Sequence, residues 1–284
     1  MFSSILDLLY SKPNFFIIGA QKCGTTSLYD YLVQHPQVLS ARYKELHFFD
    51  YYYQKGEAWY RRRLPSKAQM REARKNGDTR VITGEATPCY MVFPQTPERV
   101  YRFVPEVKLI VLLRNPVDRA FSQYQMNRAK ETVLDTETGQ MVVREPLSFG
   151  DAIAAEDERM KTAFELLKRD PWSRGQWFQM HSYKTRGLYA QQLRRWLQFF
   201  PREQMLILDS SKFYKNTDEV YARVLDFLSL QPFHLQQYEA KLVGGYREKM
   251  SPETRAQLVE YFKPHNDYLY ELLGQRFRWD KYSQ

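Results

Sequence analysis

The chain has 284 residues, which is enough to bury a sizeable hydrophobic core in one large α/β domain or in two small ones. Its 43% hydrophobic and 26% charged residues are ordinary for a globular protein, and two cysteines exclude a disulfide framework and a cysteine-rich zinc site. The formal net charge of +9 suits an anionic ligand, an acidic polymer or a nucleic acid, although ordinary solubility would also account for it.

The start of the chain, Met1–Asn14, lacks the basic and apolar regions of a signal peptide. No run approaches the roughly 20 apolar residues that a membrane-spanning helix needs. We therefore expect a cytoplasmic protein without a membrane span.

The most informative stretch, residues 15–27, reads Phe-Phe-Ile-Ile-Gly-Ala-Gln-Lys-Cys-Gly-Thr-Thr-Ser. Phe15–Gly19 is predicted to be a buried strand, and Thr25–His35 the helix that follows it. A glycine-bracketed loop at the start of a helix is typical of a phosphate-binding site, because backbone N–H groups and the helix dipole favour an anion there. The loop is not a Walker A sequence, since Lys22 precedes Gly24 by two residues.

Further along the chain, short apolar runs alternate with amphipathic segments. The strongest strand signal is Lys108–Arg114, after which Asn115-Pro116 is typical of the start of a helix, here running to about Lys130. Residues 131–146 are polar and predict a mobile loop or a hairpin tip. The remaining predicted strands are Val81–Gly84 and Met205–Leu208, and the remaining predicted helices are Gln95–Phe103, Ser148–Arg169, Thr185–Phe200, Asp218–Leu228 and Pro252–Leu273.

Strands that alternate with helices predict an α/β fold, a P-loop-like central parallel β-sheet flanked by helices on both faces. The sequence shows no linker and no internal repeat. We therefore predict a single domain over residues 1–284, in which residues 1–14 form a short N-terminal extension.

The segment Lys-Glu-Leu-His-Phe-Phe-Asp places a carboxylate, Glu45, and an imidazole, His47, two residues apart among aromatic residues. In an extended segment this spacing turns both side chains to one face. Partly dry surroundings disfavour the charged form of a carboxyl, so we expect a raised pKa that makes Glu45 a better base. A solvated Glu and His on a surface loop is the alternative interpretation.

Arg114 ends the main predicted strand, and Ser122 lies on the second turn of the helix after it. Ligands of open parallel sheets bind beyond the carboxyl ends of the strands, and a guanidinium group suits a phosphate monoester. A structural ion pair of Arg114 is the alternative. The late segment Gly244–Lys249 combines two glycines with an aromatic residue and two bases, which favours either a flap that closes on an anion or an ordinary solvated loop.

Together these motifs resemble those of sulfotransferases that use 3′-phosphoadenosine 5′-phosphosulfate (PAPS). The loop at 19–28 resembles the family's 5′-phosphosulfate loop, Arg114 with Ser122 its 3′-phosphate motif, and the Lys44–Asp50 segment the catalytic segment of the heparan sulfate glucosaminyl branch. Further similar stretches are Gly84-Glu85 with Pro88 and Tyr90, Arg186-Gly187-Leu188-Tyr189 and Phe200-Pro201-Arg202-Glu203-Gln204. The resemblance covers about Phe15 to Leu273, as in a soluble bacterial-type member of the family.

The resemblance implies a sulfotransferase fold and a set of residues that bind the donor, whose product is adenosine 3′,5′-bisphosphate (PAP). Lys22 would contact the bridging oxygen between phosphate and sulfate, while Arg114 and Ser122 would bind the 3′-phosphate. The other implied donor-binding residues are Gln21, Gly24, Thr25, Thr26, Ser27, Tyr189 and Arg247.

The resemblance also implies the chemistry. Glu45 would take the proton from an acceptor hydroxyl or amine, His47 would assist it, and the sulfuryl group would pass in line without a required metal. The acceptor implied is a carbohydrate or glycan, with a small-molecule, lipid or polyketide hydroxyl as the alternative. A P-loop NTPase or kinase, and a non-catalytic polyanion binder, remain further alternatives; no nucleic-acid partner is expected.

The sequence departs from the heparan sulfate branch at two places. Ala86 stands where those enzymes typically carry a lysine after the Glu of Gly-Glu, so a cationic contact is missing or is supplied elsewhere. The cysteine pair that commonly brackets the late loop of the Golgi enzymes is also absent, which is consistent with a reducing compartment.

Overall fold

The computed structural model describes residues 2–75, 80–130, 132–134, 140–169, 176–238 and 249–279. The chain divides into two compact units, the first formed by Met1–Leu113 with Arg194–Leu242 and the second by Arg114–Leu193 with Val243–Gln284. Each unit is built around buried residues of its own. The single domain predicted from the sequence stays a prediction.

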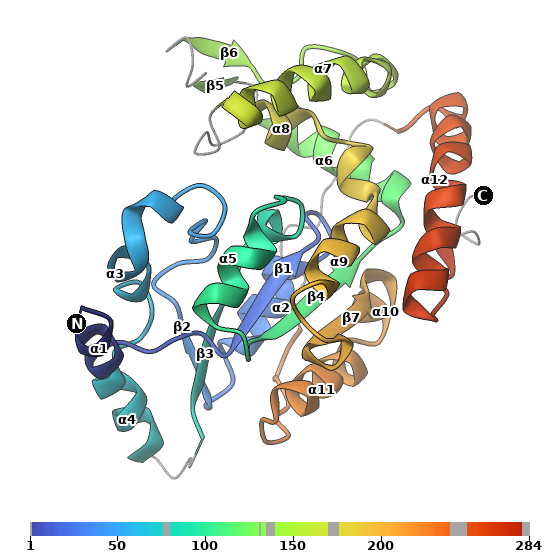
Figure 1. Cartoon of the computed structure of the whole chain (residues 1–284). Helices are drawn as coiled ribbons and strands as arrows, with labels where there is room; N and C mark the ends of the chain where they lie inside the picture. The colour runs from blue at the N-terminus through green and yellow to red at the C-terminus, as the bar shows by residue number, and fades with distance from the viewer. Residues whose placement is uncertain are drawn as a thin grey trace. The chain divides into compact units, whose positions relative to one another are not determined.

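The first unit contains a five-stranded sheet in the order β2-β3-β1-β4-β7, in which every neighbouring pair is parallel. Helix α2 covers one face of this sheet and α5 the other (Figure 1). The predicted parallel sheet with helices on both faces is therefore confirmed. Its strands are β1 (Phe15–Gly19), β2 (Val38–Ser40), β3 (Ile82–Ala86), β4 (Lys108–Leu113) and β7 (Met205–Asp209).

The central strands β1 and β4 are buried, apart from the half-buried Lys108 at the start of β4, because they are covered on both faces, as continuous apolar runs predict. Strand β3 continues two residues past the predicted end, so that Glu85 and Ala86 pair in register with Phe16 and Ile17 of β1. Gly84 permits this close pairing, since a Cβ atom there would lie 2.4 Å from the carbonyl oxygen of Phe15.

Helices of the first unit connect these strands and flank the sheet. Helix α2 ends three residues earlier than predicted, and α5 begins one residue later, with Pro97 in its first turn as expected. The helices of this unit are α1 (Phe2–Leu9), α2 (Thr25–Leu32), α3 (Gly56–Arg61), α4 (Lys67–Lys75), α5 (Thr96–Phe103), α10 (Ser210–Lys215) and α11 (Thr217–Leu228), with the short 3₁₀ turns η1 (Tyr53–Lys55), η2 (Pro88–Met91) and η4 (Arg202–Gln204).

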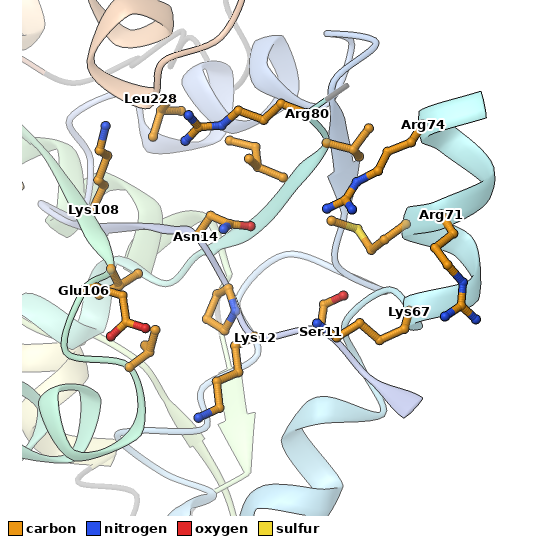
Figure 2. Close-up of a pocket in the computed structure, with 16 residues that line it drawn as sticks. Ser11, Lys12, Asn14, Lys67, Arg71, Arg74, Arg80, Glu106, Lys108 and Leu228 are labelled. Carbon is orange, nitrogen blue, oxygen red and sulfur yellow. The ribbon is translucent and has the colours of Figure 1, made fainter. Parts of the chain in front are cut away.

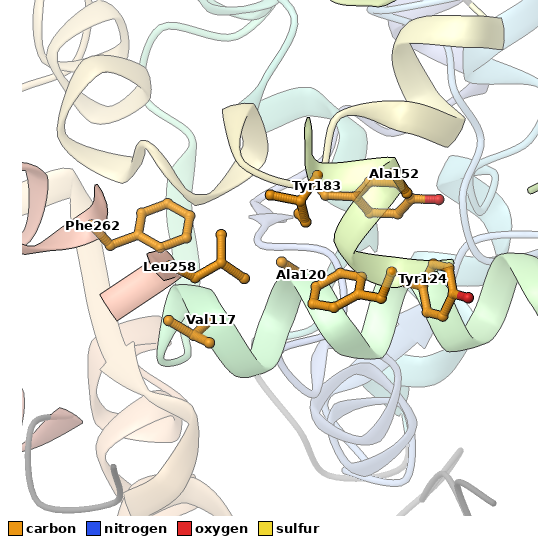
Figure 3. Packing of buried hydrophobic residues seen from close by; sticks show 9 residues of the cluster. Val117, Ala120, Tyr124, Ala152, Tyr183, Leu258 and Phe262 are labelled. Atoms are coloured by element: carbon orange, nitrogen blue, oxygen red, sulfur yellow. The ribbon is translucent and has the colours of Figure 1, made fainter. Parts of the chain in front are cut away.

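The second unit is mainly helical, and Figure 3 shows the aromatic and aliphatic residues that pack in its core. Its elements are α6 (Pro116–Ala129), the antiparallel hairpin β5 (Thr132–Leu134) and β6 (Met141–Val143), α7 (Phe149–Arg169), α8 (Gln176–His181), η3 (Thr185–Gly187), α9 (Tyr189–Leu197), which continues into the first unit, and α12 (Pro252–Leu273). The side chain of Asn115 caps α6 by accepting from the backbone N–H of Val117 at 3.0 Å, as predicted.

The helix predicted over 185–200 is instead a 3₁₀ turn followed by α9. Gly187 lies at the break, and a Cβ atom there would lie 2.7 Å from the ring of Phe262 and 2.9 Å from Pro116. Tertiary packing thus requires a glycine at this point, and glycine disfavours a continuous helix.

Candidate functional site

The loop between β1 and α2 has the geometry of an anion cradle. Gly24 is the N-cap of α2 with a φ of 95°, and a Cβ atom there would lie 2.9 Å from the hydroxyl oxygen of Tyr214. No side chain caps the helix, and the backbone N–H groups of Gly24, Thr25 and Thr26 donate to no residue that the structure describes. Unpaired N–H groups at the positive end of a helix dipole favour an anionic ligand.

The residues between β1 and α2 differ in burial and in backbone conformation. Lys22 has a φ of 69°, and Cys23 is fully buried with its thiol donating to the carbonyl oxygen of Gln21 at 3.6 Å. The side-chain oxygen of Gln21 is buried and has no hydrogen-bond partner in the described part of the chain. The loop therefore keeps backbone N–H groups open for a ligand, and Cys23 fills the interior.

Glu45 and His47 lie against the end of β3, the strand next to β1. The backbone N–H of Glu45 donates to the carbonyl oxygen of Ala86 at 3.1 Å, and Ala86 pairs in register with Ile17. The phosphate-binding loop begins three residues after Ile17, a distance of about 10 Å along a strand. The carboxyl ends of two adjacent strands thus carry the predicted cradle and the predicted base.

The segment around Glu45 is not extended, so the expectation that an extended backbone turns Glu45 and His47 to one face is wrong. Both residues have left-handed backbones, with φ of 62° and 51°. Their side chains nevertheless meet, with His47 Nε2 3.5 Å from Glu45 Oε2. Of the four described non-glycine residues with positive φ, Lys22, Glu45 and His47 are predicted site residues. Such conformations cost of order 1–3 kcal/mol each and cluster at functional sites.

His47 lies between two carboxylates. Its Nδ1 atom is 2.8 Å from Asp50 Oδ2, while its Nε2 atom faces Glu45. Burial lowers the pKa of His47, but the hydrogen bonds to Asp50 and Glu45 outweigh burial and raise it to about 11. The ring also stacks on Tyr51, with centroids 4.4 Å apart. His47 is therefore held as an imidazolium in a fixed orientation.

The expected raised pKa of Glu45 is also wrong. Burial raises the pKa of this carboxyl, yet the hydrogen bond from His47 and the charge of Lys44 lower it overall, to about 2. The Lys44 ammonium forms an ion pair with Glu45, whose side chain is 43% exposed. Charged neighbours thus outweigh the aromatic surroundings, and Glu45 is ionised at neutral pH.

Sequence reasoning missed two residues that support this site. Asp50 has a fully buried side chain and orients His47, a role that its position three residues later in the same motif could have indicated. Glu85 is also fully buried, and its carboxylate accepts from Tyr60 Oη at 2.9 Å, Tyr90 Oη at 2.9 Å, Thr87 Oγ1 at 2.8 Å and the backbone N–H of Leu46 at 3.3 Å.

Glu85 holds the turn that carries Glu45 through two routes. It binds the N–H of Leu46 directly, and it orients Tyr90, whose hydroxyl accepts from the N–H of Phe48 at 3.0 Å. Burial raises the pKa of Glu85 to about 7, although its four hydrogen bonds lower it. No sequence signal separates such a buried carboxylate from one that faces solvent.

Three possible metal ligands also meet here. One ligand atom from each of His47, Asp50 and Cys89 lies within 4.8 Å of the others. A metal at this position would have to displace the proton that the two neighbouring carboxylates favour on His47, because imidazole binds a metal in its unprotonated form.

The other predicted binding residues belong to the second unit. Tyr189 is buried, and its hydroxyl donates to the carbonyl oxygen of Arg114 at 2.9 Å. Ser122 is 2% exposed on α6, and Arg114 immediately precedes the Asn115 cap of that helix. Arg247 lies outside the described residues.

Comparison with known proteins places these observations in a family. The sulfotransferase domain family matches residues 12–243. The chain is 28% identical to the membrane-associated sulfotransferase kil1 of Dictyostelium discoideum, over 95% of this chain and 67% of that protein. It is 30% identical to human heparan sulfate glucosamine 3-O-sulfotransferase 6, over 94% of this chain and 73% of that enzyme.

A solved structure agrees with the sequence relatives. The crystal structure of a sulfotransferase from Alicyclobacillus acidocaldarius is 29% identical to this chain, with a TM-score of 0.69 over 95% of this chain and 99% of that one. Among the described helices, none is long and apolar enough to cross a bilayer. The family match covers most of the chain, including the five strands of the parallel sheet and the phosphate-binding loop. The chain therefore belongs to the sulfotransferase domain family and is a sulfotransferase.

Proposed function

We propose that this sulfotransferase moves the sulfuryl group of PAPS to a hydroxyl or amine of a glycan, with Glu45 as the base. The single observation that carries this proposal is the meeting of an open anion cradle and a Glu45–His47–Asp50 chain at the carboxyl ends of adjacent strands. Relatives named as heparan sulfate glucosamine 3-O-sulfotransferases support the glycan acceptor.

The cradle fits a phosphosulfate group. Its open N–H groups and the hydroxyls of Thr25, Thr26 and Ser27 would hold the 5′-phosphate, and the side-chain NH₂ of Gln21 would donate to the same ligand. Lys22 would neutralise the charge that develops on the leaving phosphate. Arg114 and Ser122 would bind the 3′-phosphate, with Tyr189 fixing the backbone of Arg114 and Arg247 contributing from the late segment.

The bound donor supplies the sulfuryl group and a phosphate leaving group. A bond forms between sulfur and the acceptor oxygen or nitrogen, the bond from sulfur to the phosphate oxygen breaks, and the acceptor proton goes to Glu45. His47, held as imidazolium by Asp50, orients the carboxylate of Glu45. This transfer depends on positioning and electrostatics, as phosphoryl transfer does, and the residues named here act without a metal.

Lys44 would replace the lysine that the heparan sulfate branch carries at the position of Ala86. Ala86 is fully buried on β3, whereas the Lys44 ammonium contacts the Glu45 carboxylate. An acceptor that takes over this ammonium would free Glu45 from its ion pair and raise the pKa of the carboxyl toward that of an effective base.

A transfer assay with ³⁵S-labelled PAPS tests the proposal. Desulfated heparan and chondroitin chains, glycolipids, phenols and a polyketide alcohol would be compared as acceptors, and we expect label on a glycan. Label on a lipid or a small alcohol alone would show that the acceptor is not a glycan. If PAP binds but no acceptor becomes labelled, the proposed transferase chemistry is contradicted.

Donor identity has a separate test. Because two phosphate sites are proposed, PAP should raise the melting temperature well above the shift given by ATP at equal concentration. Equal shifts in melting temperature with PAP and with ATP would contradict a dedicated 3′-phosphate site and would favour a nucleoside triphosphate as the ligand.

A further inference from the structure

A cavity of about 500 Å³ opens in the first unit at the amino ends of the central strands. Its walls include Asn14 just before β1 and Lys108 at the start of β4 (Figure 2). Ile82, at the start of β3, also lines it. The phosphate-binding loop follows the other end of β1, so the cavity and the transfer site lie at opposite edges of the same sheet. The cavity has the size of a small-molecule site, for which roughly 300–1,000 Å³ is usual.

The charge of this cavity is strongly one-sided. Among the described residues that line it, Glu106 is the one acid. Six basic residues also line the cavity: Lys12, Lys67, Arg71, Arg74, Arg80 and Lys108. They come from α4, from the strand β4 and from the segments before β1 and β3, so tertiary structure gathers them from four places in the chain.

Most of these cations have no carboxylate partner. Lys12 donates to the carbonyl oxygen of Phe103 at 3.3 Å, and Lys108 donates to the carbonyl oxygen of Phe227. Within the described parts of the chain, no ion pair joins Arg71, Arg74 or Arg80 to an acid. Their guanidinium groups remain available for the forked contacts that phosphate and sulfate esters accept.

The cations also crowd one another. Burial lowers the pKa of Lys108 and the positive charge of Arg80 lowers it further, while the negative charge of Asp226 offsets part of this effect. An anion placed between these groups would remove that repulsion. Asn14 adds polar character, because its side-chain oxygen already accepts from the backbone N–H of Thr83 at 3.0 Å, which directs the amide NH₂ elsewhere.

The floor of the cavity is aliphatic, formed by Met70, Val81, Ile82, Val104, Val107 and Leu228. No aromatic residue lines it among the residues described. Nucleic-acid bases are usually held by stacking on aromatic side chains, and long polyanions by open grooves. A concave site with a basic rim and an aliphatic floor therefore favours a compact ligand that carries no nucleobase.

We propose that this cavity is a second anion site, which binds a compact organic ligand that carries several phosphate or sulfate ester groups. The ligand is held by Arg71, Arg74 and Arg80 at the rim and covers the aliphatic floor. The site is separate from the sulfuryl-transfer site, which follows the other end of β1. Such esters occur both on free metabolites and on lipid headgroups, so the test has an arm for each source.

The test measures binding of inositol hexakisphosphate and sucrose octasulfate by calorimetry, and of vesicles with or without phosphatidylinositol bisphosphate by sedimentation. Wild-type chain is compared with Arg71→Gln/Arg74→Gln/Arg80→Gln and with a charge-matched control, Arg102→Gln/Lys215→Gln/Arg223→Gln, whose residues are exposed elsewhere on the same unit. We expect the cavity variant to bind roughly a hundredfold more weakly, at about fivefold per cation, and the control to bind like the wild type.

Arginine-dependent binding of the soluble probes supports the proposal with a free ligand, and arginine-dependent binding to vesicles alone supports it with a lipid headgroup. Equal binding by both triple variants, or none by the wild type, overturns it. Lys22→Ala identifies probe bound at the transfer loop, because that fraction alone is lost in this variant. Failure of the second site is thereby distinguished from failure of the proposed transfer chemistry.

Discussion

The charged side chains at the two ends of one parallel sheet differ in whether they are paired with opposite charges. At the carboxyl ends, Lys44, Glu45, His47 and Asp50 form a continuous chain in which each charged group faces an opposite charge. At the amino ends, six cations surround a cavity with a single described acid, Glu106, among its lining residues.

The difference shows that a reacting group and a binding surface are prepared in different ways. Buried hydrogen bonds from the backbone N–H groups of Leu46 and Phe48 to Glu85 and Tyr90 fix the turn that carries Glu45, so its geometry is set before a ligand arrives. The rim arginines of the cavity are exposed and attract a ligand by charge rather than by fixed geometry. Reaction requires the first arrangement, because misplacing a reacting group by about 1 Å can cost a hundredfold in rate.

Among substitutions at the sulfuryl-transfer site, Lys22→Ala should lower turnover the most. Loss of the ammonium from the cradle should lower sulfuryl-transfer turnover roughly a thousandfold, the upper range for removal of one charge-stabilising donor. Lys263→Ala, an exposed cation of α12, is the matched control and should turn over normally. Turnover near the wild-type rate in Lys22→Ala would contradict the role of this loop.

Glu45→Gln should come next, with turnover lowered at least about a hundredfold because the acceptor proton loses its base. PAP affinity should not change, since the substitution leaves the phosphate-binding loop intact. Steady-state kinetics and calorimetric titration of PAP check both halves. Loss of PAP binding together with turnover would show that Glu45 supports structure and that the base lies elsewhere.

Glu85→Gln tests whether the buried support fixes the turn. An amide cannot accept from all four donors, so the N–H of Leu46 loses its partner, and we expect kcat to fall about tenfold, within the range seen for residues that orient others. Tyr90→Phe breaks the second route through Phe48 and should act in the same direction. Unchanged kcat in both variants would assign Glu85 to folding alone.

The pH dependence of stability gives Glu85 a second readout. Its pKa of about 7 in the folded chain exceeds the ordinary 4.5, so between these values the folded state keeps a proton that the unfolded state releases, and stability falls as pH rises. Glu85→Gln removes this contribution. The loss of melting temperature in the variant should therefore be larger at pH 5 than at pH 8, and an equal loss at both would contradict a raised pKa.

The smallest expected effect is that of Lys44→Gln. Lys44 helps to lower the pKa of Glu45, so its removal should raise that pKa and move the acid limb of the kcat/KM profile to higher pH. A pH–rate profile from acid to neutral pH checks the direction. A shift to lower pH, or none, would show that the Lys44 charge does not act on the base.

Several features were readable from local sequence because they depend on neighbouring residues. The strand Phe15–Gly19 and the helix Pro252–Leu273 were predicted at their observed bounds, and the glycine-bracketed loop indicated an anion site before any contact was known. Asn115 and Pro116 likewise predicted the start of α6. Caps, buried runs and turn residues act over a few positions, so they leave a local signature.

Other features failed because they depend on distant residues. The pKa of Glu45 was expected to rise, yet the approach of Lys44 and His47 lowers it, and the left-handed turn that brings them together is held by β3, some 40 residues later. Thr185–Phe200 was predicted as one helix, but packing of Gly187 against Phe262 breaks it.

The sequence by itself determined the α/β class, the phosphate-binding loop and the family motifs, since each follows from periodicity or from short-range spacing. Tertiary structure alone decided the charge state of Glu45 and His47, the support from Glu85, and the gathering of six cations at the opposite edge of the sheet. The physical reason is that electrostatic interactions and burial depend on distance in space, which the order of residues along the chain does not give.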